Sequence, residues 1–242
     1  MQRSRYALAA ALALALVPAL GTASQRDVDK VMGSITAHAG EQYGDLTTVN
    51  GSIRVEKNAV ARDATTVNGS IHIEEGGKVA AAETVNGSIR FDGRNEARAI
   101  ETVNGGIRVG GQSKIGGIET VNGSVFVDRG SRIDGSVETV NGAIGLVDTD
   151  VSGNVETVNG DVTVGVGSHV RGGLTVHKPT SNWTPVSVNR RKLRIVIGPN
   201  AVVEGPLVFE REVTLYVHAT AKVGTVTGAT AVRYDGDRAP QD

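Results

Sequence analysis

The sequence predicts an all-β fold, a parallel β-helix (β-solenoid) with 18-residue coils. The tetrapeptide Thr-Val-Asn-Gly recurs seven times, beginning at Thr48, Thr66, Thr84, Thr102, Thr120, Thr139 and Thr157. Every start-to-start interval is the same except the one from Thr120 to Thr139, which is longer by a single residue. A unit this short cannot contain the two helices of a helical repeat, which takes roughly 33 residues or more. It fits one coil, whose short strands stack on their counterparts about 4.8 Å away.

Each repeat also carries the alternation of a half-buried strand. Counting Thr as position 1, position 2 is always Val, position 6 is Ile or Val, and position 8 is apolar, as in Val49, Ile53 and Val55. Side chains two residues apart lie on the same face of a strand. We therefore expect positions 2, 6 and 8 to form stacked apolar ladders inside the coil.

The asparagine at position 3 is the best candidate for a polar ladder. Identical residues stack along the axis of such a fold, and stacked amides hydrogen-bond to one another. We predict a structural ladder of Asn50, Asn68, Asn86, Asn104, Asn122, Asn141 and Asn159. The Asn-Gly pair is also expected to mark a bend, because both residues tolerate positive φ.

The sequence leaves the handedness of the coil open. Equal steps from position 2 to 8 to 14 suit a left-handed triangular helix. The Glu before Thr in five coils stands where that fold prefers a small inward residue, which favours a right-handed coil instead.

Residues 1–24 have the features of a secretory signal peptide. Arg3 and Arg5 precede an apolar run from residue 7 to 17, and small residues follow up to Ser24. The run is too short to span a bilayer as a helix, although an uncleaved anchor is the alternative. We expect export to the periplasm, the outer-membrane surface or the exterior, with no transmembrane span after cleavage.

The remaining chain divides by composition. Residues 25–177 form the repeat array, 178–192 a polar loop that contains the single Trp183, and 193–237 further solenoid coils. A polar tail, 238–242, follows.

Composition excludes several classes of function. The chain has 25 Lys+Arg against 26 Asp+Glu, no Cys, and only 3% aromatic residues. Near-neutrality argues against nucleic acid as a partner, since such proteins carry a basic face. Absence of Cys excludes disulfides and thiolate metal sites.

Two outward rows are candidates for contact with a ligand. Glu83, Glu101, Glu119, Glu138 and Glu156 form a carboxylate row that either binds Ca²⁺ or, as we expect, is a hydrated stripe neutralised by basic neighbours. Position 7 carries Arg54, His72, Arg90 and Arg108. This basic row either contacts an anionic envelope polysaccharide or, as we expect, is a solvated face.

Enzymatic alternatives have weaker support. The five His share no ligand spacing, although His218 invites comparison with the His base of hexapeptide acyltransferases, which are also β-helices. Asp128, Asp148 and Asp150 could serve a polysaccharide lyase or hydrolase, yet uniform coils leave no cleft for one. Ice-binding solenoids use outward Thr-x-Thr rows, and the single Thr per coil here argues against that function, although the Thr row from Thr48 to Thr157 is still a flat regular face. We predict no catalytic, cofactor-binding or metal-binding residue.

The Glu-Thr-Val-Asn-Gly-Ser-Ile-Arg-Val array from Val31 to Val176 resembles the adhesin β-strand-repeat family of bacterial envelope proteins. The segment from Ile195 to Gly224 is similar to bactofilins, polymer-forming cytoskeletal proteins built as short β-helices. The resemblances imply a non-enzymatic structural or adhesin-like envelope protein, with end-to-end self-association as one expectation. The alternative is a protein that binds or processes polysaccharide. Arg54, Arg90, Arg108 and Trp183 are the predicted surface contacts.

Overall fold

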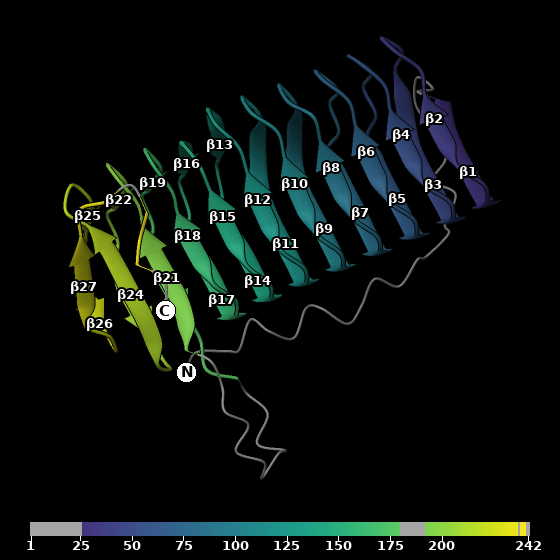
Figure 1. Ribbon diagram of the computed structural model, residues 1–242. Helices are drawn as coiled ribbons and strands as arrows, with labels where there is room; N and C mark the ends of the chain where they lie inside the picture. The colour runs from purple at the N-terminus through teal and green to yellow at the C-terminus, as the bar shows by residue number, and fades with distance from the viewer. Residues whose placement is uncertain (1–25, 180–191, 237, 241–242) are drawn as a thin grey trace.

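The computed structural model describes residues 26–179, 192–236 and 238–240. These residues form one continuous stack of β-strands, and no described residue is helical (Figure 1). Neighbouring strands pair in parallel, and partners such as Ile71 and Ile89 hold the same repeat position in successive coils. The predicted β-solenoid is therefore confirmed. Eleven coils at about 4.8 Å each give a stack roughly 50 Å long.

One wall of the solenoid is an 11-stranded sheet with one short strand from each coil. Its strands in order are β2 (Ile35–Ala37), β4 (Ile53–Val55), β6 (Ile71–Ile73), β8 (Ile89–Phe91), β10 (Ile107–Val109), β12 (Val125–Val127), β15 (Ile144–Leu146), β18 (Val162–Val164), β21 (Leu193–Ile197), β24 (Val213–His218) and β27 (Ala231–Tyr234).

The other wall is a 16-stranded sheet that divides into two arms after β11. Its first strands are β1 (Arg26–Met32), β3 (Tyr43–Asn50), β5 (Asp63–Asn68), β7 (Ala81–Asn86), β9 (Glu96–Asn104) and β11 (Lys114–Asn122). One arm continues through β14 (Val137–Asn141), β17 (Val155–Asn159), β20 (Leu174–Val176), β23 (Leu207–Phe209) and β26 (Val226–Thr227). The other continues through β13 (Ser131–Ile133), β16 (Thr149–Val151), β19 (His169–Val170), β22 (Val202–Val203) and β25 (Lys222–Val223).

The core consists of aliphatic ladders that run the length of the stack. Ile53, Ile71 and Ile89 are partners in successive strands of the 11-stranded sheet, and all three are buried. Position 8 behaves in the same way: Val55, Ile73 and Val109 are fully buried. The expectation for positions 6 and 8 is confirmed. With one buried residue of each kind per coil, stability accumulates through contacts between neighbouring coils.

The expectation that the valine at position 2 lies inside the coil is wrong, and the threonine at position 1 takes the inner place instead. The threonines point inward, and Thr48 and Thr66 are 0% exposed, whereas Val49 and Val67 lie outward and only half-buried. Each threonine hydroxyl through Thr139 donates a hydrogen bond to the position-4 glycine carbonyl of the preceding coil, as from Thr66 Oγ1 to Gly51 O at 2.9 Å. The hydroxyl is therefore satisfied inside, and the Thr row offers no outer face of the ice-binding kind.

The glycine of the repeat is needed for close approach of the coils rather than for positive φ. Asn50 and Gly51 both have ordinary φ. A Cβ on Gly105 would lie 1.9 Å from the carbonyl oxygen of Gly87, the same position one coil earlier. The expected role of positive φ at this bend is wrong for most repeats, because only glycine lets the coil corners stack at strand spacing.

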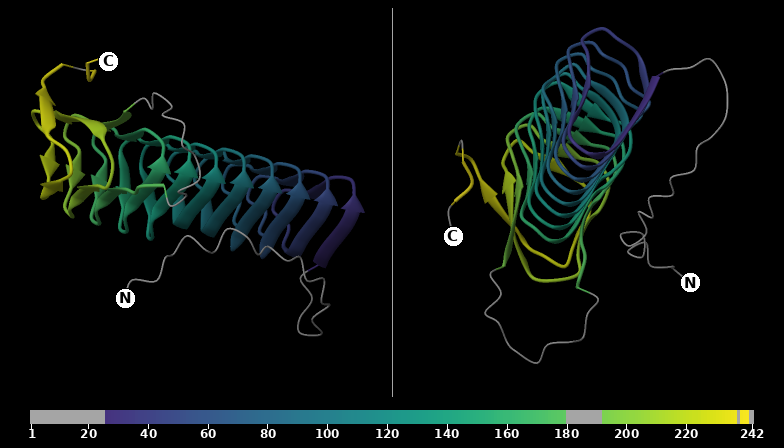
Figure 2. Two further views of the ribbon diagram at one scale, coloured as in Figure 1. Left: turned by 90° about the horizontal axis from the view of Figure 1, so that it is seen from below. Right: turned by 90° about the vertical axis from the view of Figure 1, so that its right-hand side faces the viewer.

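The same stack continues beyond the repeat array. β21 pairs with β18 of the last repeat, and β23 pairs with β20, so the chain rejoins the stack after residues 180–191. Figure 2 shows these coils following the axis of the earlier ones, with the C-terminal segment turning outward from the last coil. Tyr216, on the outer side of β24, packs there with Val196 and Tyr234.

Candidate functional site: the outer ladders and the elbow

The predicted asparagine ladder lies on the outer corner of the coil, at the ends of strands β3, β5, β7, β9, β11, β14 and β17. Each Nδ2 donates a hydrogen bond to the Oδ1 of the preceding asparagine at 2.9–3.0 Å, from Asn159 up to Asn50. The amides are exposed, but each is held by its neighbours. The ladder therefore stabilises this corner. Its amides all point the same way along the axis, so the Nδ2 of Asn50, the first member, donates to no other asparagine of the ladder.

Arg211 closes the other end of this ladder. Its Nη1 donates to Asn159 Oδ1 at 2.6 Å and to the carbonyl oxygen of Val158 at 3.0 Å. Val158 is consequently only 8% exposed, although the valines before it are half-exposed. Sequence reasoning missed Arg211, because it lies 52 residues from its partner and outside the repeat.

The basic row lies on the outer face of the 11-stranded sheet, as expected, but Arg54, His72 and Arg90 are ion-paired there. Arg54 forms an ion pair with Glu74 at 2.8 Å, and Arg90 and His72 share Asp92 at 2.8 and 2.9 Å. Burial raises the pKa of Asp92, but the hydrogen bonds from Arg90 and His72 outweigh it and lower the pKa overall. Arg108 lies over the ring of Phe126, 4.6 Å from its centroid. These pairings leave the row poorly suited to bind an anionic polymer.

The carboxylate row lies on the outer side of the 16-stranded sheet, so its Glu does not occupy an inward slot. Glu83 and Glu101 are partners in register. Burial raises the pKa of both, and the next carboxylate, Glu101 for Glu83 and Glu119 for Glu101, raises it further. Among the described residues, no basic side chain forms an ion pair with Glu83, Glu101 or Glu119, so the expected neutralisation is wrong for these three.

Beside this row, β9 and β11 pass from one arm of the sheet to the other, and we call this junction the elbow. Two open hollows lie along it, of about 480 and 250 Å³. The larger is lined by Arg98, Lys114 and Asp134, and the smaller by Glu101 and Glu119. Small residues form the elbow, including Ala80, Ala99, Gly116, Gly117 and Ser136.

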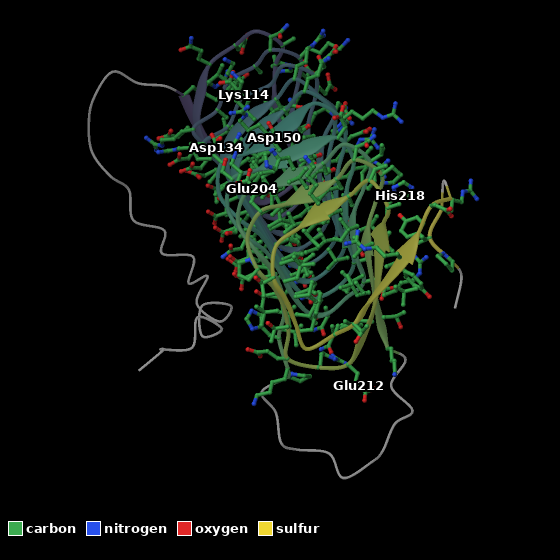
Figure 3. The ribbon with its side chains drawn as sticks, turned by 90° about the vertical axis from the view of Figure 1, so that its left-hand side faces the viewer. Lys114, Asp134, Asp150, Glu204, Glu212 and His218 are labelled. Carbon is green, nitrogen blue, oxygen red and sulfur yellow. The ribbon has the colours of Figure 1, made fainter. Side chains whose placement is uncertain are left out.

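The elbow presents several charged side chains that form no ion pair in the described part of the chain. Arg98, Lys114 and Asp134 make no ion pair there, although Lys78 and Glu96 pair at 3.1 Å. Figure 3 shows Lys114, Asp134, Asp150 and Glu204 along the same side of the stack. Farther along, Asp150 pairs with Arg132 at 3.3 Å, and Glu204 with His169 at 2.7 Å. The sequence signal for the elbow was the change at positions 15–16 from Arg62-Asp63 to Ala80-Ala81 and Gly116-Gly117, with Arg98-Ala99 between them.

The acidic and histidine residues considered for catalysis are not brought together. Within residues 26–179, 192–236 and 238–240, no group of three His, Asp or Glu side chains is arranged to hold a metal ion. His218 is buried against Tyr234, with ring centroids 5.0 Å apart, and its Nδ1 lies 2.9 Å from Thr220 Oγ1. Trp183, a predicted surface contact, lies outside the described residues.

No family model, curated protein or solved structure matches this chain. A search of the described residues for a helix long and apolar enough to cross a membrane finds none.

Proposed function

We propose that the chain is an exported, non-enzymatic β-solenoid that acts as a structural or adhesin-like component of a bacterial envelope. The observation that carries this proposal is the uniformity of the stack: the same inner and outer ladders continue coil after coil, without a long insertion among residues 26–179. Such a stack presents extended lateral faces whose charges recur once per coil. Periodic surfaces of this kind suit a polymer that repeats along its length.

The shape of the surface favours contact over catalysis. A catalytic acid or base needs a site that excludes water and fixes its partners. Both elbow hollows are open, and the charged groups that line them, such as Lys114 and Glu119, are exposed. The apolar run of residues 7–17 supports export.

The elbow is the lateral face that best supports contact with an envelope polymer, because its charges are not already paired. Arg98 and Lys114 supply cations on one side, and Glu101 and Glu119 supply acceptors on the other. Charged faces of this kind bind with a strength that falls as salt rises. The paired row of Arg54 and Arg90 provides a matched surface without free charge.

Cosedimentation with isolated peptidoglycan sacculi and with lipopolysaccharide vesicles tests the proposal. We expect binding to at least one of them, weakened by salt, reduced several-fold in Arg98→Gln/Lys114→Gln and retained in the control Arg54→Gln/Arg90→Gln. If the protein binds neither the sacculi nor the vesicles, an envelope contact is contradicted. Release of soluble fragments from the sacculi would contradict the non-enzymatic assignment.

A second candidate is a protein that binds or processes polysaccharide, and the hollow beside Glu101 and Glu119 is the observation that favours it. Under this reading the polar loop around Trp183 would make the contact, since an aromatic ring stacks on a sugar face. Trp183→Ala should then lose binding to soluble polysaccharide. Undiminished binding by this variant would rule out the loop as the contact, and undiminished binding by Glu101→Gln/Glu119→Gln as well would rule the second candidate out.

A further inference from the structure

Two cations of β1 stand on the inward side of the N-terminal end, whereas Asp29 between them is the register partner of Thr47 on the outer side. Arg26 in β1 is the register partner of the buried Tyr43, and its guanidinium carbon lies 6.0 Å from the centroid of that ring. Lys30 is the register partner of Thr48, so it occupies the inward slot that threonine fills in the next seven coils. Its Nζ donates to the carbonyl oxygen of Ser34 at 2.7 Å and stays exposed.

A third cation occupies an inner slot at the C-terminal end. Arg233 in β27 is the register partner of Val217, which is fully buried and belongs to the apolar ladder of the 11-stranded sheet. Its Nη1 donates to the carbonyl oxygen of His218 at 3.4 Å. The neighbouring edge strands β25 and β26 have only two residues each.

These cations stand where the ends would otherwise associate. β1 is a seven-residue edge strand with no described strand on its outer side, and Val31 and Met32 beside Lys30 are 71% and 79% exposed. An exposed apolar edge is a template for pairing with another chain, and an inward-pointing charge at an edge prevents it. Another coil placed on either end would bury the inward charge, which is costly when no carboxylate pairs with it.

We infer that Arg26, Lys30 and Arg233 are end caps that keep the solenoid a single rod, by excluding coaxial stacking on a second copy. Coaxial stacking in any arrangement would bury two of these inward charges: Lys30 and Arg233 in head-to-tail contact, Lys30 of both copies in head-to-head contact, and Arg233 of both copies in tail-to-tail contact. Association through the ends, expected from the resemblance to bactofilins, is thereby disfavoured. Contacts with other molecules are left to the lateral faces.

Sedimentation velocity and negative-stain microscopy of the protein expressed from its full sequence test this inference over a wide range of concentrations. Lys30→Thr/Arg233→Val restores at each end the residue type of its ladder. We expect monomeric wild type, and at least about a twofold rise in average mass with end-to-end rods for the double variant. The control Lys57→Thr/Arg129→Val makes the same exchanges on exposed lateral turns and should stay monomeric.

Lys30→Ala/Arg233→Ala provides an independent test if the first variant folds poorly. It removes both inward charges and leaves small side chains, so we expect the same end-to-end association. End-to-end rods of the wild type would overturn the inference. So would two variants that keep a β-sheet circular dichroism spectrum and yet remain monomeric.

Discussion

Replacement of the repeat glycine by alanine should separate the coils at one corner. In Gly105→Ala the new Cβ would lie 1.9 Å from Gly87 O and 2.5 Å from its carbonyl carbon, both of them backbone atoms that no rotamer change can move. Relief requires an axial shift that strains the hydrogen bond from Gly105 N to Asn122 O, 3.0 Å long, and the asparagine ladder beside it. Overpacking among side chains costs about 1–3 kcal/mol. A clash with backbone atoms is harder to relieve, so we expect the free energy of unfolding to fall by ~3 kcal/mol or more.

The next residue provides a matched control. A Cβ on Gly106 would approach only Ser124 O, at 3.3 Å, and most other repeats carry Ser at this position. Urea unfolding of Gly105→Ala and Gly106→Ala, followed by circular dichroism, should show a large loss of stability for the first and little for the second. Equal midpoints for the two variants would refute the argument that coil spacing demands this glycine.

Three further outcomes follow from single contacts. Arg211→Ala should lower the free energy of unfolding by ~1–3 kcal/mol and speed amide hydrogen exchange around Val158, because two hydrogen bonds and the side chain that covers Val158 are lost. Thr157 Oγ1 is buried without a hydrogen-bond partner among the described residues, so Thr157→Val should raise the free energy of unfolding by ~1 kcal/mol, whereas Thr102→Val should lower it. Glu101→Gln should raise the melting temperature near pH 7. The raised pKa of Glu101 disfavours its ionised form in the fold, so this difference should vanish below the ordinary pKa of Glu.

Much of the fold follows from the repeat, because an 18-residue period and alternating apolar residues admit few architectures. What hydropathy could not predict is which of two neighbouring residues faces inward. Valine is the more apolar, yet Thr48 lies inside because its hydroxyl finds the carbonyl oxygen of Gly33 at 3.0 Å. Valine then takes the outer corner. A hydrogen bond across coils decided the orientation, and only the three-dimensional stack shows that partner.

The outer surface was harder to predict because its partners lie about one coil away in sequence. Arg54 forms an ion pair with Glu74, 20 residues later in the chain. A residue predicted to contact a ligand is therefore already paired within the protein. The elbow was not predicted, since its hollows depend on how two arms of one sheet join around Gly116. The end caps were missed for another reason: Lys30 and Arg233 stand outside the regular repeats, and only strand register reveals that they occupy ladder slots.

Fractionation of cells that express the full chain tests the central claim, export to the envelope, most directly. Mass spectrometry of the recovered protein should show an N-terminus near Ser24, and the protein should be recovered with the periplasmic or outer-membrane fraction. Uncleaved protein of 25.1 kDa confined to the cytosol would contradict export and, with it, an envelope function for this solenoid.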